Sequence, residues 1–275
     1  MTRQVSQHLL ARSTSPDDLH EIPTNLSGFT ACLCLDKIIC EAVEELYSPF
    51  KMNTAWVNVQ GSVSDLNEKL TRWNSNLPQS LKLSTVPSDR APRERFHLAF
   101  RFYSTRMIIN WPCLFMTWNI NPVATTQPES LKSFDADAAE NCRAAAKDLL
   151  RLLPDHGSTS AIYDSAPWWC VLHFIVQAAV VLVTGIQAEP SRAWTSEEDD
   201  SITGSIRALR WLMVLSDKDS SARRAWYALS RLLLLSFTNI GRDTDFLAPY
   251  IPADTSLSRP FASSSSMFLN QSTAY

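Results

Sequence analysis

The chain has 275 residues, a formal net charge of −3 and a hydrophobic fraction of 45%. This apolar content is sufficient for a sizeable core, whereas only 6 glycines leave few of the turns that sheet proteins use. The slightly acidic balance argues against a surface dedicated to nucleic acid, although it does not exclude a local basic face.

The first 20 residues contain no continuous apolar stretch, so they do not have the pattern of a secretory signal. Residues 1–16 contain Arg3, Arg12 and several serines but no acidic residue, which weakly favours the alternative of a mitochondrial presequence. Helical spacing starts near residue 30. We therefore expect residues 1–29 to form a flexible N-terminus.

Two helices are predicted in the first third of the chain. In 34–46, the apolar residues Leu35, Ile38, Ile39, Ala42 and Leu46 share one face. In 63–78, Ser62 or Ser64 is the expected N-cap and Pro78 the expected end. The apolar face of this second helix consists of Leu66, Leu70, Trp73 and Leu77.

The segment 93–114 combines an apolar stripe with four arginines. Pro112 is expected to end its helix, because proline lacks a backbone amide and disturbs the preceding turn. The stripe consists of Phe96, Phe100, Tyr103, Met107 and Trp111. The arginines, which lie mostly on the other sides, are Arg93, Arg95, Arg101 and Arg106. They are compatible with phosphate contacts, but a solvated face beside a buried stripe is the favoured interpretation.

The segment 134–157 predicts a further helix, capped by Asp135 and ended by Pro154 and Gly157. Acidic residues precede basic ones along it, which suits the helix dipole. Its predicted packing face contains mostly small residues and permits a close approach of another helix. That face consists of Cys142, Ala145, Leu149 and Leu152.

Residues 166–186 carry no charge and are long enough to span a bilayer. However, His173 and Gln177 interrupt the apolar run, and no basic cluster flanks it to set an orientation. The favoured interpretation is the central helix of a soluble domain, because such a helix is apolar on all sides.

Two neighbouring helices follow, joined by a short polar break with Asp219 or Ser220 as N-cap. The chain then becomes rich in Ser and Thr, and 251–275 is predicted to be disordered. The fold class is all-α, a single helical domain of about seven to nine helices with disordered termini. Five tryptophans are expected in or beside its core: Trp111, Trp168, Trp169, Trp211 and Trp226.

The sequence contains no recognisable catalytic, cofactor-binding or metal-binding set of residues. Cys32, Cys34 and Cys40 do not have the close pairing of a zinc site, and the six cysteines are expected to be reduced and structural. Phosphate-binding glycine motifs and a nucleophile elbow are missing from the sequence. The isolated His173 is expected to be a core or edge residue rather than a base. We therefore predict no enzyme activity and no cofactor.

Four segments, in this order, resemble the regulatory domain of fungal zinc-cluster (Zn2Cys6) transcription factors, also called the fungal-specific transcription factor domain. They are LNEKLTRWNSNLPQSL at 66–81, RFHLAFRFYSTRMIINWPCL at 95–114, NCRAAAKDLLRLL followed by PWWCVLHFIVQAAVVLV within 141–183, and IRALRWLMVLSDKDSSARRAW at 206–226. The domain predicted from this resemblance covers 30–250. The six-cysteine cluster with which family members bind DNA is not in this sequence.

The resemblance implies a nuclear transcriptional regulator, in the style of those that control a metabolic or secondary-metabolite gene cluster. The expected partners are other transcription factors or co-regulators, a small-molecule effector and a second subunit in a homo- or hetero-dimer. Direct specific DNA binding and membrane association are not expected. The alternative is an all-α enzyme or small-molecule receptor with a pocket beside the tryptophans.

We predict that the purified chain binds no stoichiometric zinc, because it lacks four ligands at metal-site spacing. Elemental analysis after extensive dialysis should detect only traces of the metal. A full equivalent of tightly held zinc per chain would show that the cysteine interpretation is wrong.

Overall fold

A computed structural model describes residues 24–49, 54–83, 93–118, 128–154, 168–188 and 200–252. Within these ranges it contains seven α-helices, two short 3-10 helices and no strand, which confirms the predicted all-α single domain. The first helix begins at Thr24, so the end of the segment predicted to be flexible is helical. The presequence alternative and nearly all of the Ser/Thr-rich tail lie outside the described residues.

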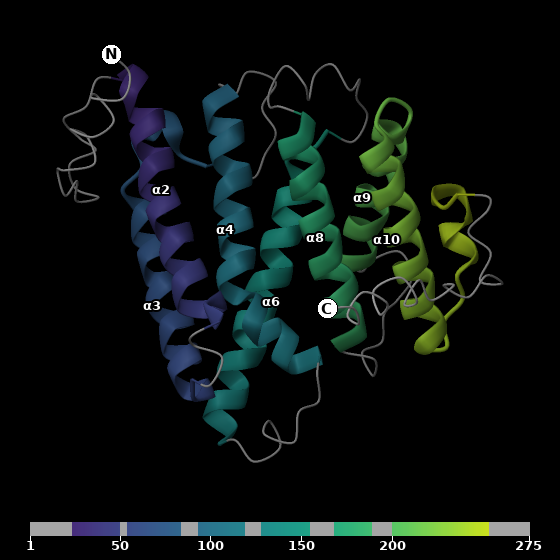
Figure 1. Ribbon diagram of the computed structural model, residues 1–275, viewed down its shortest axis with the longest axis horizontal. Helices are drawn as coiled ribbons and strands as arrows, with labels where there is room; N and C mark the ends of the chain where they lie inside the picture. The colour runs from purple at the N-terminus through teal and green to yellow at the C-terminus, as the bar shows by residue number, and fades with distance from the viewer. Residues whose placement is uncertain are drawn as a thin grey trace, which may run out of the picture.

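The helices follow one another across the domain roughly in chain order (Figure 1), with α2 and α3 at one end, α4, α6 and α8 in the middle, and α9 and α10 at the other end. The α-helices are α2 Thr24–Tyr47, α3 Trp56–Ser75, α4 Arg93–Trp118, α6 Glu129–Arg151, α8 Trp168–Ala188, α9 Asp200–Ser216 and α10 Ser220–Asn239. The 3-10 helices are η3 Gln79–Leu81 and η4 Asp245–Tyr250.

Helix α4 lies at the centre of the domain and packs against α2, α3, α6 and α8. The predicted stripe is confirmed: Phe100, Tyr103 and Met107 are buried, and the stripe's two end residues pack against the core. Other sides of the helix are buried as well, including Leu98 and Ile109. The helix is therefore an interior element rather than a surface helix with one apolar face.

The prediction that Pro112 ends this helix is wrong, because α4 continues to Trp118. Proline removes the amide that would bond to the carbonyl four residues earlier, which here belongs to Ile108. Two effects offset this loss. Cys113 and Leu114 beyond the proline are completely buried, and the hydroxyl of Tyr47 donates to the Ile108 carbonyl at 2.6 Å.

Two predicted helix starts are also wrong. Helix α3 begins at Trp56, where Ala55 is the N-cap and makes no side-chain bond, instead of at Ser62 or Ser64. Helix α6 begins at Glu129, so Asp135 is not its cap but a buried residue inside it. Asp135 instead bonds to the first turns of α3, through Trp56 and Gln60. By contrast, Asp219 caps α10 as predicted.

The Asp135 carboxylate accepts hydrogen bonds from two side chains of α3. The indole Nε1 of Trp56 lies 3.0 Å from one carboxylate oxygen, and Gln60 Nε2 lies 2.8 Å from the other. Burying a carboxylate is costly unless hydrogen bonds satisfy it. These donors therefore hold the start of α3 against α6.

Helix α8 is the apolar segment of the sequence. By length and composition it is able to cross a membrane, but 61% of its most apolar window is buried inside the domain. It packs against α4, α6, α9 and α10. This burial supports the interior-helix interpretation, while the absence of membrane association stays a prediction.

Two glycines allow the helices around α8 to approach closely. A Cβ on Gly204 of α9 would lie 2.8 Å from Leu182 Cδ1 of α8. A Cβ on Gly185 of α8 would lie 2.6 Å from Cδ of Arg143, a buried residue of α6. Both distances are shorter than carbon atoms tolerate, so a side chain at either position would force Leu182 or Arg143 to move within the packed α6, α8 and α9 layers.

The C-terminal helix pair ends in a glycine turn. Gly241 follows α10 with a positive φ of 69°, and the amide of Arg242 donates to the Phe237 carbonyl at 2.9 Å, as in a helix that ends at a left-handed residue. This turn leads to η4, where the Tyr250 carbonyl accepts a 2.7 Å bond from Trp226 Nε1.

The predicted tryptophan positions are largely confirmed. Trp211 is buried, and Trp111 and Trp226 pack against the core. The expectation for Trp169 is wrong, because this side chain is 59% exposed at the first turn of α8. The side chain of Trp168 lies outside the description.

We predict that Trp211→Ala lowers the free energy of unfolding by about 3–5 kcal/mol, because it opens a cavity between α9 and its neighbours. Urea denaturation followed by far-UV circular dichroism measures this loss. Trp169→Ala is the matched control and should leave the midpoint almost unchanged. Equal midpoints for the two variants would contradict the assignment of Trp211 to the core.

Candidate functional site

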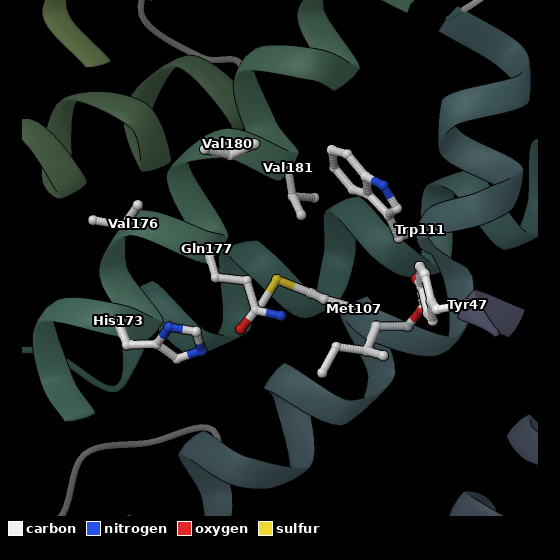
Figure 2. Close-up of a pocket in the computed structure, with 9 residues that line it drawn as sticks. Tyr47, Met107, Trp111, His173, Val176, Gln177, Val180 and Val181 are labelled. Carbon is white, nitrogen blue, oxygen red and sulfur yellow. Dashed lines mark hydrogen bonds between the residues drawn. The ribbon is translucent and has the colours of Figure 1, made fainter. Parts of the chain in front are cut away.

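An apolar groove of about 400 Å³ lies between α4 and α8, close to the end of α2. Helix α4 contributes Met107, Ile108 and Trp111, and Tyr47 is the last residue of α2. Figure 2 shows the side chains from α8 facing those from α4. The residues from α8 are His173, Val176, Gln177, Val180 and Val181. The groove thus lies beside Trp111, and its lining is mostly apolar.

The phenol of Tyr47 connects this groove to the proline of α4. Its hydroxyl donates to the Ile108 carbonyl at 2.6 Å, which is the carbonyl that Pro112 leaves without a helical partner. The residue is 41% exposed, yet desolvation raises the pKa of Tyr47, with smaller contributions from Cys142 and Cys113. The hydroxyl therefore stays protonated and remains a donor throughout the neutral pH range.

Gln177 and His173 explain why the apolar segment contains polar residues. Gln177 Oε1 accepts a 2.6 Å bond from the Ser104 hydroxyl, which joins α8 to α4 below the groove. His173 is exposed at the rim, and its ring lies 5.6 Å from that of Phe174 in an edge-on arrangement. The structure thus places His173 at an edge, as predicted. The residues that line the groove beside it include no Asp or Glu.

The two best-buried thiols are poor nucleophiles. Burial raises the pKa of Cys113, and the neighbouring carboxylate of Asp135 raises it further. Burial also raises the pKa of Cys142, whose sulfur lies 3.5 Å from the Met107 carbonyl. Both cysteines therefore remain thiols that fill the interface between α4 and α6.

The cysteines near the N-terminus do not form a metal site in the structure. All three lie on α2, where Cys32 is half-buried, Cys34 is buried and Cys40 is exposed. Among the described residues, no group of three or more His, Cys, Asp or Glu side chains is arranged to hold a metal ion.

Two of the predicted surface arginines make contacts between helices. Arg101 pairs with Asp36 of α2, and Arg106 Nη2 donates to Asn141 Oδ1 of α6 at 2.9 Å. These side chains are half-buried rather than fully solvated. The structure places neither of them in an exposed row that would follow a nucleic-acid backbone.

The site residues that the sequence did not indicate come from helices far apart in the chain. Tyr47 is an example, because it is the last residue of a helix with an ordinary apolar face. The groove has one apolar floor, one histidine at its rim and a hydrogen-bonded amide. This lining suits the binding of an apolar group.

No protein-family model matches the chain, and no solved structure matches it significantly. The chain is similar to a protein of Aspergillus niger named transcription regulator galc, with 25% identity over 233 residues. The similarity covers 73% of this chain and 28% of the Aspergillus protein. The chain thus corresponds to a little over a quarter of that relative's length.

We predict that Tyr47→Phe lowers the free energy of unfolding by about 0.5–1.5 kcal/mol, because the Ile108 carbonyl loses its donor. In a Pro112→Ala background the same change should cost much less, since an amide at position 112 restores the helical bond. A double-mutant cycle by urea denaturation measures this coupling. Equal losses in the two backgrounds would contradict the link between the phenol and the proline.

Proposed function

We propose that this chain forms the helical regulatory domain of a fungal transcription regulator of the zinc-cluster type, and that it acts in the nucleus. The observation that carries the proposal is the similarity to the Aspergillus transcription regulator, which extends over 233 residues. The packing of the segments at 66–81, 95–114, 141–183 and 206–226 adds support, because their described residues contribute to one continuous core. Since the chain matches only 28% of the relative, the role of the whole protein is part of the proposal.

The domain acts on transcription of genes for a metabolic or secondary-metabolite pathway through co-regulators, a dimer partner or an effector. It makes no specific DNA contacts of its own. Specific recognition needs an element that docks in a groove and places side chains on base edges, together with a positive surface. The sequence has a net charge of −3, and Arg101 is engaged in an ion pair with Asp36 between α4 and α2.

The groove beside Trp111 favours a ligand-binding role as the second candidate. Its apolar walls would hold an apolar group, and such a receptor role is compatible with regulation. An all-α enzyme has less support, because the residues that line the groove with His173 include no carboxylate and no thiol.

Deleting the gene should change the transcript levels of a defined gene set, and the unmodified gene should restore them on reintroduction. Transcript sequencing of the deletion and complemented strains measures both effects. Unchanged transcripts would contradict the regulatory role, and turnover of a small molecule by the purified protein would favour the enzyme alternative.

The purified 275-residue chain should show no sequence-selective shift of DNA fragments at physiological salt. Weak binding at low salt should disappear steeply as salt increases, because it would depend on phosphate charge alone. A fragment that is selected repeatedly at physiological salt would show that this domain reads DNA itself.

A further inference from the structure

A second pocket, of about 440 Å³, lies between α3, α4 and α6. Unlike the apolar groove, it has both an apolar floor and polar walls. The floor consists of Leu70, Phe102 and Phe134. The polar lining residues are Ser64, Asn67, Thr71, Asn74, Arg106 and Asn141.

Arg106 is distinguished from the neighbouring arginines by its partner. Arg72, Arg101, Arg143 and Arg151 all form ion pairs with carboxylates. For Arg106, the hydrogen bond found among the described residues goes to the amide oxygen of Asn141 at 2.9 Å, and no described carboxylate pairs with it. A half-buried guanidinium has lost part of its hydration and has donors left for an anion.

The side-chain amides of Asn67 and Asn110 orient each other beside the pocket. Asn67 and the buried Asn110 exchange two hydrogen bonds, at 2.9 and 3.0 Å, and Asn110 also donates to the Arg106 carbonyl at 2.8 Å. This arrangement fixes α3 against α4 and leaves Arg106 as the positive group in the lining. A ligand with one negative charge and an apolar body would therefore complement this lining.

We propose that this pocket binds a small organic monocarboxylate, with the carboxylate on Arg106 and the apolar body on Leu70, Phe102 and Phe134. A guanidinium presents two parallel donors that match a carboxylate. Inorganic phosphate fits less well, because it would leave the apolar floor uncovered and would place close to two charges against a single arginine. The idea that this carboxylate is an effector of transcription rests on the proposed function. The binding of the carboxylate to the pocket does not depend on it.

Binding is tested with the purified 275-residue chain and three carboxylates: benzoate, phenylacetate and hexanoate. Saturation-transfer NMR detects contact, and calorimetry gives the affinity. At least one of these probes should bind. Its uncharged amide should bind at least about tenfold more weakly, because the charged hydrogen bond to Arg106 is lost. Inorganic phosphate should also bind at least about tenfold more weakly, because it leaves the apolar floor uncovered. Arg106→Gln should weaken the carboxylate by a similar factor, whereas Arg106→Lys should retain part of the affinity.

Two further variants keep the test informative if Arg106→Gln does not fold. Thr71→Trp changes an exposed lining residue and should abolish binding by filling the pocket. Arg72→Gln is the matched control, since Arg72 pairs with Glu68 on the surface and is not in the lining. Full affinity should remain in this control.

The proposal is overturned if none of the three carboxylates binds at millimolar concentration, if the amides or phosphate bind equally well, or if Thr71→Trp leaves binding intact. Failure of binding would leave the transcriptional role untouched, because that role is measured from transcripts in a deletion strain. Conversely, unchanged transcripts together with Arg106-dependent binding would retain the site and remove its effector role.

Discussion

The fold depends on helix α4 remaining continuous through Pro112. On its N-terminal side, Phe102 and Arg106 line the polar pocket, while Met107, Ile108 and Trp111 line the apolar groove. If the helix ended at the proline, the completely buried Cys113 and Leu114 beyond it would lose their places in the core. The Tyr47 hydroxyl supplies the donor that the proline removes, so α2 stabilises a break in the hydrogen bonding of another helix.

A buried carboxylate sets the relative positions of α3 and α6 in a similar way. Asp135 is only 6% exposed and is satisfied by Trp56 and Gln60. A shift of α3 by one residue would leave this charge without donors, and such an unpaired group is costly. The polar pocket lies further along the same pair of helices, so the contact that fixes the register also positions the pocket walls.

The interior of the domain could be predicted from the sequence because apolar spacing reports burial directly. The faces of α2, α3 and α4 contained the residues that became the core, and Asp219 was recognisable as a cap because it bonds to its own helix. The starts of α3 and α6 were missed because the expected cap residues do not cap: Asp135 bonds to α3 across the helix interface, and α3 begins after Ala55 without a side-chain cap. Trp169 was misplaced because apolar character alone does not tell which side of an all-apolar helix faces solvent.

The candidate sites were harder to predict than the core. Each combines residues from three helices that are remote in sequence, and none contains a motif of fixed spacing. Arg106 had the spacing of a surface residue, and only the packing of α3 and α6 on either side of it creates a pocket. The resemblance to a regulatory domain and the similarity to a fungal transcription regulator agree with each other.

The continuity of α4 is the central physical claim, and amide hydrogen exchange measured by NMR tests it most directly. The amides of Cys113 and Leu114 follow the proline and are expected to exchange as slowly as that of Ile109, since all three lie in one buried helix. Rapid exchange at Cys113 and Leu114 beside slow exchange at Ile109 would show that the helix ends at Pro112, and the claim that α4 is continuous would then be wrong.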